Sequence, residues 1–387
     1  MEKKLRLGII GIGNMGSGHV RNLEAGKCPE IELTAVADID ADRLAWAKDF
    51  VKHEIGLFGS AEEMLDSGLI DAVIVAVPHY DHPKYAIMAM EKGIAVMVEK
   101  PAGVYTKQVK EMIAVADKTK VPFGLMMNQR THPIYRKMRE IVKSGVMGEI
   151  RRTNWIITEW YRPNAYYASG DWRATWSGEG GGVLLNQCPH NLDIWQWICG
   201  TPVKVSAHLG FGKWHDIEVE DDVTAYVEYE NGATGVFVTT TGDNPGTNRF
   251  EIDFEKGKLV AENGRLYQWL SEYKEQDWSA TTTDPFGRAP YEYKEIPVEG
   301  EATNHPGVLN AFADHILHGG EMVADAREGL KAVSISNAMH FSQWTGKPVS
   351  IPFDDDAYYE ELKKHIATSR RKTNVVKVIK EDMSSTF

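Results

Sequence analysis

The sequence predicts an α/β N-terminal domain built on a parallel sheet, followed by an α+β C-terminal domain with a large open, mainly antiparallel sheet. In the first third of the chain, short apolar runs alternate with amphipathic stretches at the spacing of βαβ units. After about residue 129 this alternation ends, and residues 203–270 consist mostly of strand-like runs separated by turns. The 387 residues, of which 43% are hydrophobic, supply enough apolar material for two cores.

The first domain is expected to cover residues 1–128. The run DAVIVAV at residues 71–77 is rich in β-branched side chains, which is typical of a strand buried on both faces. Strands are expected at residues 5–10, 31–37, 71–77, 95–99 and 121–127, with helices at residues 14–25, 41–51, 83–92 and 107–118. Such alternation predicts a parallel sheet with helices on both of its faces.

The second domain is expected to cover residues 129–353, and residues 354–387 are expected to form a polar C-terminal extension. An Asn231-Gly232 pair between two alternating runs predicts a hairpin turn. A loop rich in glycine, tryptophan and tyrosine is expected at residues 161–182. Helices are expected at residues 134–142, 183–198, 306–317 and 326–345, and a long strand at residues 149–160.

Composition narrows the class of protein. The formal net charge of −12 argues against nucleic acid or an anionic membrane surface as a partner. The three cysteines, Cys28, Cys188 and Cys199, are too few and too scattered for a disulfide framework or a zinc site. No apolar stretch approaches the length of a membrane span. We therefore expect a cytoplasmic protein without a metal ion.

A glycine-rich loop lies between the first strand and the first helix, and consists of Gly11, Ile12, Gly13, Asn14, Met15 and Gly16. In such a loop Gly11 permits the tight turn, Gly13 lets backbone approach a pyrophosphate, and Gly16 allows close packing of helix on strand. The helix N-terminus then faces the phosphates. The sequence thus predicts a Rossmann domain that binds a dinucleotide, because the expected strand and helix flank the loop. A glycine turn that merely packs a βα unit is the alternative.

Asp38 ends the second expected strand, at the distance from the loop where a carboxylate can bind a ribose 2′-hydroxyl. A carboxylate there repels a 2′-phosphate. Arg43 is the nearest basic residue downstream and lies on the following helix, so NAD is expected as the cofactor and NADP is disfavoured. An N-terminal helix cap is the structural alternative for Asp38.

Glu99-Lys100-Pro101 follows the expected strand at residues 95–99, at the end that faces the ligand crevice in an open α/β sheet. Burial and a nearby cofactor cation would lower the pKa of such a lysine. The amine could then take a proton from an alcohol or stabilise an alkoxide. A surface Glu–Lys pair is the alternative explanation.

Three glycines at residues 180–182 precede a second polar motif. Asn186 and His190 are four residues apart, and Asp193 and Trp197 continue the same stripe of the expected helix. Pro189 would bend this helix or mark its true start. A packing histidine is the usual explanation for a lone His on a helix, but the glycines and the Lys100 motif favour a site.

These motifs, together with the run Ala76-Val77-Pro78-His79-Tyr80-Asp81-His82, resemble the glucose–fructose oxidoreductase / inositol dehydrogenase / rhizopine catabolism (GFO/IDH/MocA) family. Its members are two-domain NAD(P)-dependent dehydrogenases of sugars, cyclitols and related polyols. The resemblance extends to about residue 352. It implies that Lys100 is catalytic and that His190 accepts the proton of the substrate hydroxyl. It also implies cofactor contacts by Pro78, His82, Glu99, Lys100, Asn128, Trp172 and Arg173.

The chain departs from the family pattern at Asn186, where inositol-type members have Asp. An amide cannot carry charge, but it can orient a hydroxyl. We keep Asn186 with Lys100 and His190 in the expected catalytic group, while the strict inositol dehydrogenase assignment is weakened. The Cys188-Pro189 pair also replaces the usual glycine-containing dipeptide.

Aromatic side chains are dense in and around the loop at residues 161–182. Such rings can stack on a sugar while polar groups bind its hydroxyls. Burying the loop or forming an oligomer interface is an equal alternative. The expected substrate-binding residues are Lys100, Tyr161, Arg162, Trp172, Asn186 and His190. His79 to His82 has metal-like spacing but is assigned to the cofactor rim, and His305 could reach the substrate pocket.

The main hypothesis is an NAD-dependent dehydrogenase of a sugar, glycoside or cyclitol. One alternative is an NAD-dependent glycoside-cleaving enzyme that works by transient oxidation and elimination. Another is a non-catalytic dinucleotide or sugar sensor, against which the intact Lys100 and His190 argue. The family resemblance implies a homodimer or homotetramer formed through the C-terminal sheet.

Overall fold

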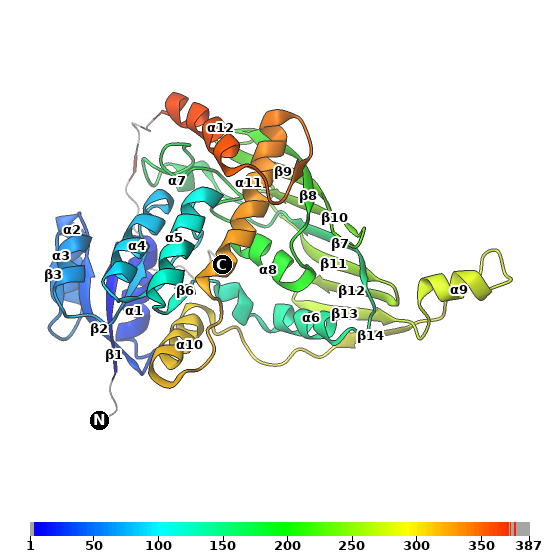
Figure 1. The fold of residues 1–387 in the computed structure, drawn as a ribbon, viewed down its shortest axis with the longest axis horizontal. Helices are drawn as coiled ribbons and strands as arrows, with labels where there is room; N and C mark the ends of the chain where they lie inside the picture. The colour runs from blue at the N-terminus through cyan, green and yellow to red at the C-terminus, as the bar shows by residue number, and fades with distance from the viewer. Residues whose placement is uncertain (1–3, 371, 373–374, 377–387) are drawn as a thin grey trace.

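The computed structural model describes residues 4–370, 372 and 375–376, and their backbone forms two sheets (Figure 1). The first sheet has six parallel strands in the order β3-β2-β1-β4-β5-β6. Its strands are β1 (Leu5–Ile10), β2 (Ile31–Ala37), β3 (Gly56–Phe58), β4 (Ala72–Val75), β5 (Ala95–Val98) and β6 (Phe123–Leu125). The expected α/β class is confirmed.

Helices cover both faces of this first sheet, because its strands are apolar on both sides. Val73 and Val75 of β4 point into one core, and Ile74 points into the core on the opposite face. The first-domain helices are α1 (Asn14–Glu24), α2 (Ala41–Phe50), α3 (Ala61–Asp66), α4 (His82–Glu91) and α5 (Thr106–Thr119). The sequence analysis did not predict the short β3 and α3.

The second sheet has nine strands in the order β14-β13-β12-β11-β7-β10-β9-β8-β15. The β7–β10 pair is parallel and the other pairs are antiparallel, so the sheet is mainly antiparallel as expected. Its strands are β7 (Ile150–Ile157), β8 (Lys204–Phe211), β9 (Glu220–Glu228), β10 (Thr234–Thr240), β11 (Asn248–Phe254), β12 (Gly257–Glu262), β13 (Arg265–Leu270), β14 (Glu292–Ile296) and β15 (Val349–Ser350).

One face of the second sheet is covered by helices, and its core contains a buried aromatic group. The rings of Trp155 and Phe250 stack with centroids 4.3 Å apart, and Phe237 packs edge-on against Trp155. The expected turn at Asn231-Gly232 joins β9 to β10, with Gly232 at φ 82°. The remaining helices are α6 (Pro133–Ser144), α7 (Asn164–Tyr167), α8 (Pro189–Cys199), α9 (Glu275–Thr281), α10 (Asn304–His318), α11 (Gly329–Thr345) and α12 (Asp355–Thr368).

The helix expected at residues 183–198 begins later than predicted. Proline has no backbone N–H and its ring clashes with the preceding turn, so it is tolerated only in the first turn of a helix. Residues 183–188 accordingly form turns, and α8 begins at Pro189. Asn186 therefore precedes the helix that carries His190 and does not share its face.

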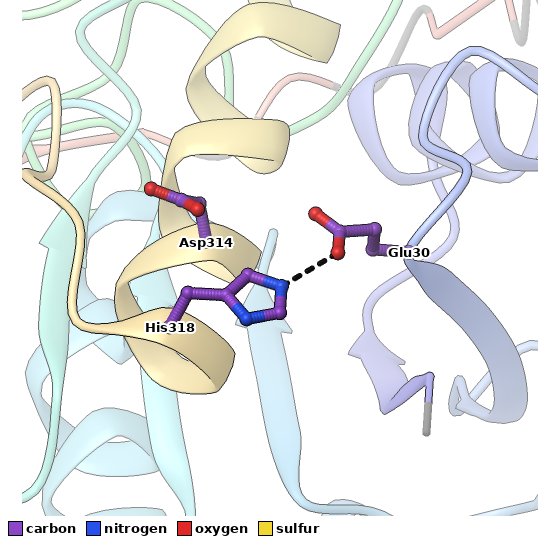
Figure 2. Close-up of side chains that lie close together, drawn as sticks. All are labelled: Glu30, Asp314 and His318. Atoms are coloured by element: carbon purple, nitrogen blue, oxygen red, sulfur yellow. Dashed lines mark hydrogen bonds and ion pairs between the residues drawn. The ribbon is translucent and has the colours of Figure 1, made fainter. Parts of the chain in front are cut away.

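Helix α10 lies on the first sheet, although its residues fall within the range expected for the second domain. Val308, Leu309 and Phe312 are buried in the core beside β1. On the surface, His318 Nε2 lies 2.7 Å from Glu30 Oε1, with Asp314 beside the pair (Figure 2). This ion pair adds a polar contact between α10 and the segment that leads into β2.

The segment after residue 353 does not remain a polar extension. Residues 355–368 form α12, in which Tyr358 and Leu362 are fully buried. Tyr358 and Leu362 lie one turn apart and form an apolar stripe on α12, and Tyr358 stacks on Trp344 of α11. The rest of the expected extension lies largely outside the described residues. None of the described helices combines the length and apolar composition that crossing a bilayer requires.

A buried ion pair joins the turn that follows β6 to α8. Arg130 lies in the 3₁₀ turn η2 (Asn128–Thr131), and its Nε and Nη2 each donate to Asp193 over 2.7 Å. Glu328 accepts a further bond of 3.0 Å from Nη2. Asp193 therefore faces this junction and does not extend a polar stripe from His190 as the sequence suggested. Trp197 lies under the Arg130 guanidinium, 5.2 Å from ring centroid to Cζ.

Replacing Asp193 by Ala should lower the free energy of unfolding by about 3–5 kcal/mol, because Arg130 would stay buried without its bidentate partner. Urea denaturation followed by circular dichroism measures this change. Arg265→Ala is the control, since its 3.5 Å contact with Glu295 is exposed and should contribute less than about 1 kcal/mol. Equal losses in both variants would contradict a stabilising role of the buried Arg130–Asp193 pair.

Candidate functional site

A cleft of about 510 Å³ opens at the carboxyl ends of β1, β2, β4 and β5. This is the edge where open α/β sheets bind their ligands. Of the residues predicted for the site, the cleft is lined by Gly11, Gly13, Asn14, Met15, Asp38, Pro78, His82, Glu99, Lys100, Trp172, Arg173 and Asn186. The cleft thus brings together the glycine loop, the Lys100 motif and the aromatic loop, which are far apart in the sequence.

The glycine loop has the close approaches that its residues predict. Gly11 has φ 84°, in the left-handed region that favours glycine. A Cβ added to Gly16 would lie 1.9 Å from the carbonyl oxygen of Gly11, so no larger residue fits. No side chain caps the N-terminus of α1. Its free N–H groups and the positive end of the helix dipole therefore fit a pyrophosphate.

Asp38 is held by backbone at the mouth of this loop. Its Oδ2 accepts from the N–H of Ile12 over 2.8 Å, and its Oδ1 accepts from the N–H of Asp40 over 2.9 Å. The side chain of Ile12 is buried in the core, so the expected contribution of Ile12 to a ligand is limited to its backbone. Gly16 likewise packs inside the turn and does not line the cleft.

Arg43 lies closer to this site than its place on the helix suggested. Its Nε donates to the carbonyl oxygen of Ile12 over 2.8 Å, and its guanidinium lies 5.7 Å from the ring centroid of Trp46. Burial is the largest effect on Arg43 and lowers its pKa, while the charge of Asp38 partly opposes this. A cation and a carboxylate thus stand side by side where the adenosine ribose of a dinucleotide would lie.

Lys100 ends β5 with its amine turned toward the second domain. Its Nζ donates to the backbone carbonyl oxygen of Asn186 over 2.9 Å. Burial lowers the pKa of Lys100, which brings the amine closer to the range of a general base. Its neighbour Glu99 lies 2.6 Å from His19 Nε2; burial alone would raise the pKa of Glu99, but the bond and charge of His19 lower it to about 2.

His190 lies in the first turn of α8, and neither of its ring nitrogens has a hydrogen-bond partner among the described residues. Burial lowers the pKa of His190 well below its usual value, and the charge of Lys100 lowers it further. The ring is therefore neutral near pH 7 and has one nitrogen able to accept a proton. Such an unpartnered buried imidazole is suited to a polar ligand.

A buried carboxylate, Glu179, was missed by the sequence analysis. Its Oε2 accepts from the N–H of Ala174 over 2.6 Å, and its Oε1 accepts from Asn186 Nδ2. The signal was present, since Glu179 directly precedes the three glycines at residues 180–182. His19 was also missed, although it lies one helical turn after Gly16.

The three-glycine segment is held against the second sheet by another buried carboxylate, Glu220. Its side chain accepts from the N–H of Gly182 over 2.9 Å and from the N–H of Leu184 over 3.0 Å. A Cβ on Gly182 would lie 2.0 Å from the carbonyl oxygen of Glu220. His340 Nε2 pairs with the same carboxylate at 2.9 Å. Glycine at residue 182 thus lets the segment that carries Asn186 lie directly on β9.

The remaining predicted residues have mixed positions. Tyr161 is 41% exposed and does not line the cleft. Arg162 lies between the rings of Trp160 and Tyr166, and its Nε has no partner among the described atoms. Asn128 is buried, with its Oδ1 likewise unpartnered there.

Three histidines surround the Lys100 motif. The two ring nitrogens of His82 face the carbonyl oxygens of Pro101 and Val77 at 2.7 and 2.8 Å. Burial lowers the pKa of His82, and the neutral ring donates to one of these oxygens at a time. His79 Nδ1 lies 3.2 Å from the carbonyl oxygen of Glu179. His305 reaches the His19–Glu99 pair, with its ring centroid 5.6 Å from that of His19.

Comparison with protein families matches both parts of the chain. The oxidoreductase family with an NAD-binding Rossmann fold (GFO_IDH_MocA) matches residues 5–127, and the GFO/IDH/MocA C-terminal domain matches residues 135–260. The uncharacterized oxidoreductase YrbE of Bacillus subtilis is 26% identical over 91% of this chain and 98% of its own length. Trans-1,2-dihydrobenzene-1,2-diol dehydrogenase of Bos taurus is 29% identical over 60% of this chain and 67% of its own length.

Solved structures resemble the chain over nearly its whole length. The WlbA dehydrogenase of Chromobacterium violaceum, in complex with NADH and UDP-GlcNAcA, has a TM-score of 0.77 and 28% identity, covering 92% of this chain and 98% of that one. A levoglucosan dehydrogenase in complex with NADH and L-sorbose has a TM-score of 0.76 and 20% identity, covering 91% of this chain and 100% of that one. At that identity the second likeness concerns the fold alone.

Gly16→Ala should abolish dinucleotide binding and lower the melting temperature, because the new Cβ would overlap the Gly11 carbonyl oxygen. NADH fluorescence titration and thermal unfolding measure the two effects. Gly18→Ala is the matched control in the same helix, since no atom lies within 4 Å of its added Cβ. We expect it to leave binding unchanged and to stabilise the helix by up to about 1 kcal/mol. Normal NADH binding by Gly16→Ala would show that the turn tolerates the side chain.

Proposed function

Because the chain belongs to the GFO/IDH/MocA family of NAD(P)-binding oxidoreductases, we propose that it is an NAD-dependent dehydrogenase of a sugar, glycoside or cyclitol. One observation carries the proposal. The amine of Lys100 lines the dinucleotide cleft and donates to the backbone of Asn186. His190 does not itself line the cleft, but its buried ring, unpartnered among the described residues, lies within reach of the Lys100 charge. The WlbA dehydrogenase, 28% identical and solved with NADH and UDP-GlcNAcA, supports the same substrate class.

The residues of the cleft fit a dinucleotide, and different residues bind its different parts. The uncapped N-terminus of α1 binds the pyrophosphate, and Asp38 accepts from the ribose hydroxyls. When bound, the nicotinamide supplies a two-electron acceptor for the carbon that bears the substrate hydroxyl. Trp172 and Arg173 line the cleft from the second domain.

Lys100 and His190 handle the proton of the substrate hydroxyl. His190 is neutral, so its free nitrogen can take the proton as the carbonyl forms. The lowered pKa of Lys100 lets its amine share this proton or stabilise the developing alkoxide. Asn186 orients the hydroxyl through its amide. Oxidation therefore slows as the pH falls and these two groups become protonated.

We also propose that the open face of the second sheet carries the expected homo-oligomer contact. Ile156, Tyr226 and Tyr293 project from this face and are 40%, 44% and 55% exposed. Apolar and aromatic side chains gathered on one face are typical of protein interfaces.

Incubating the protein with NAD and a panel of sugars, glycosides and cyclitols should generate NADH absorbance with at least one alcohol. Lys100→Met and His190→Asn should each lower kcat by about 10²–10⁴-fold, because each removes a proton-transfer group, while NAD affinity changes little. Lys118→Met and His208→Asn are matched controls at exposed positions. Failure of every alcohol would exclude simple dehydrogenation, and cleavage of an aryl glycoside without net NADH would favour the elimination mechanism.

Replacing Asp38 by Ser should raise the affinity for NADP relative to NAD by about tenfold or more. The carboxylate that repels a 2′-phosphate is lost, and the Arg43 guanidinium remains beside the site. Titration with both cofactors gives the ratio of dissociation constants. Asp42→Asn is the control, because Asp42 is an exposed carboxylate on α2, the helix that carries Arg43. An unchanged ratio in Asp38→Ser would remove Asp38 from cofactor selection.

A further inference from the structure

We propose that Glu179 is a positioning residue that fixes the amide of Asn186, so that the amide carbonyl oxygen faces the substrate hydroxyl, and that its carboxylate supplies the negative charge beside Lys100. This inference rests on the proposed dehydrogenase function and assigns the acceptor of that site. It also explains how a chain with an amide at residue 186 keeps a carboxylate in the same cluster.

The contacts of Glu179 determine how the amide of Asn186 is oriented. Asn186 Nδ2 donates to Glu179 Oε1. The reverse orientation would turn the amide oxygen toward the carboxylate, with two acceptors in contact. The amide oxygen therefore points away from Glu179, and Asn186 is one of the residues that line the cleft. A carbonyl oxygen in that position accepts from a hydroxyl and cannot donate to it.

The donors around Glu179 favour its ionised form, against the opposing effect of burial. One carboxylate oxygen accepts from Asn186 and the other accepts from the N–H of Ala174 over 2.6 Å. Arg173 Nη1 lies 4.0 Å from Oε1. Burial raises the pKa of Glu179, and Arg173 is the largest opposing influence. Because both oxygens already accept, a protonated carboxyl group would have to give up one of these bonds.

Glu179 also shapes the loop that covers the cleft. Ala174 has φ 51°, in the left-handed region that a non-glycine residue adopts only when its surroundings hold it there. The bond from its N–H to Glu179 is such a restraint, and Trp172 and Arg173 directly precede it. The same carboxylate thus connects the loop at residues 172–174 to Asn186 and, through the Asn186 backbone, to Lys100.

Charges of both signs face Lys100 from several elements. Glu99 and Glu179 raise its pKa, whereas Arg173 and Arg162 lower it alongside burial. The charge of Lys100 lowers the pKa of four histidines: His79, His82, His190 and His305. The charge of Glu179 also acts to raise the pKa of Tyr167 and of Lys372. Glu99 is paired with His19. A substitution of Glu179 can therefore change the pKa of Lys100 without breaking the His19–Glu99 pair.

Glu179→Gln tests the proposal. The Gln oxygen would stay on the backbone N–H of Ala174, so its NH₂ group would face Asn186 Nδ2, which is also a donor. Asn186 would then turn its oxygen toward Gln and its Nδ2 toward the substrate, which removes the acceptor. We expect kcat/KM for the alcohol to fall at least tenfold, while the dissociation constant for NAD changes less than twofold. The pKa of Lys100 should fall by about half a unit or more, because a nearby negative charge is lost.

The pKa of Lys100 is measured in the protein without substrate, by the pH dependence of its labelling with an amine reagent followed by peptide mass spectrometry. This readout is independent of turnover. If no alcohol is oxidised but the Lys100 pKa moves, the dehydrogenase proposal fails and the charge assignment of Glu179 stands. If turnover is found but neither kcat/KM nor the Lys100 pKa responds to Glu179→Gln, the Glu179 proposal is overturned alone.

The double variant Glu179→Gln with Asn186→Asp is the rescue. Gln would donate to one oxygen of Asp, and the other oxygen would again face the hydroxyl as an acceptor with a negative charge beside Lys100. We expect it to recover at least fivefold in kcat/KM over Glu179→Gln and to restore the Lys100 pKa. A folded double variant no better than the single one contradicts the proposal.

Glu218→Gln is the matched control, because Glu218 also holds backbone N–H groups near this loop but does not contact Asn186. Neither kcat/KM nor the Lys100 pKa should change in it. If Glu179→Gln does not fold, Asn186→Leu decides the matter, since it keeps Glu179 and removes only the amide. Wild-type kcat/KM in Asn186→Leu would overturn the proposal, and a loss of at least tenfold with unchanged NAD affinity supports it.

Discussion

The bidentate ion pair between Arg130 and Asp193 is the contact on which the geometry of the site depends. Lys100 comes from the end of a strand in the first sheet, and His190 comes from a helix that packs on the second sheet. Asp193 lies three residues after His190, so tying Asp193 to Arg130 at 2.7 Å also sets the position of His190 relative to Lys100. A buried pair of this kind is directional, because charge and bonding geometry must both be satisfied.

Inside the site, buried carboxylates hold separate segments of the chain together by accepting hydrogen bonds from them. Glu99, Glu179 and Glu220 are each nearly inaccessible, and each accepts from donors on a different segment. A buried charge without partners would be costly, so each carboxylate requires its donors to stay in place. The result is a framework around Lys100 and His190 in which the Lys100 amine donates to the backbone carbonyl oxygen of Asn186, while the ring nitrogens of His190 have no partner among the described residues. These unpartnered nitrogens distinguish His190 from the carboxylates of the framework.

Much of the fold and part of the site follow from local patterns. The glycine loop is defined by residues within a single βα unit, and Asp38 and Lys100 lie at strand ends that periodicity identifies. The contacts that organise the site could not be found in this way. Arg130 and Asp193 are 63 residues apart, and His318 reaches Glu30 across 288 residues. Glu179 is adjacent to the glycines, yet nothing in its neighbours indicates that its oxygens bind Ala174 and Asn186.

The sequence by itself therefore determined the α/β and α+β classes, the dinucleotide loop and the position of Lys100 at a strand end. Each of these depends on short-range periodicity or on steric limits within a few residues. The tertiary structure decided that α10 packs on the first sheet and that Asp193 pairs with Arg130. It also brought Glu179 to the amide of Asn186. These outcomes depend on which distant donors and acceptors meet when apolar surfaces are buried, and no local pattern encodes that choice.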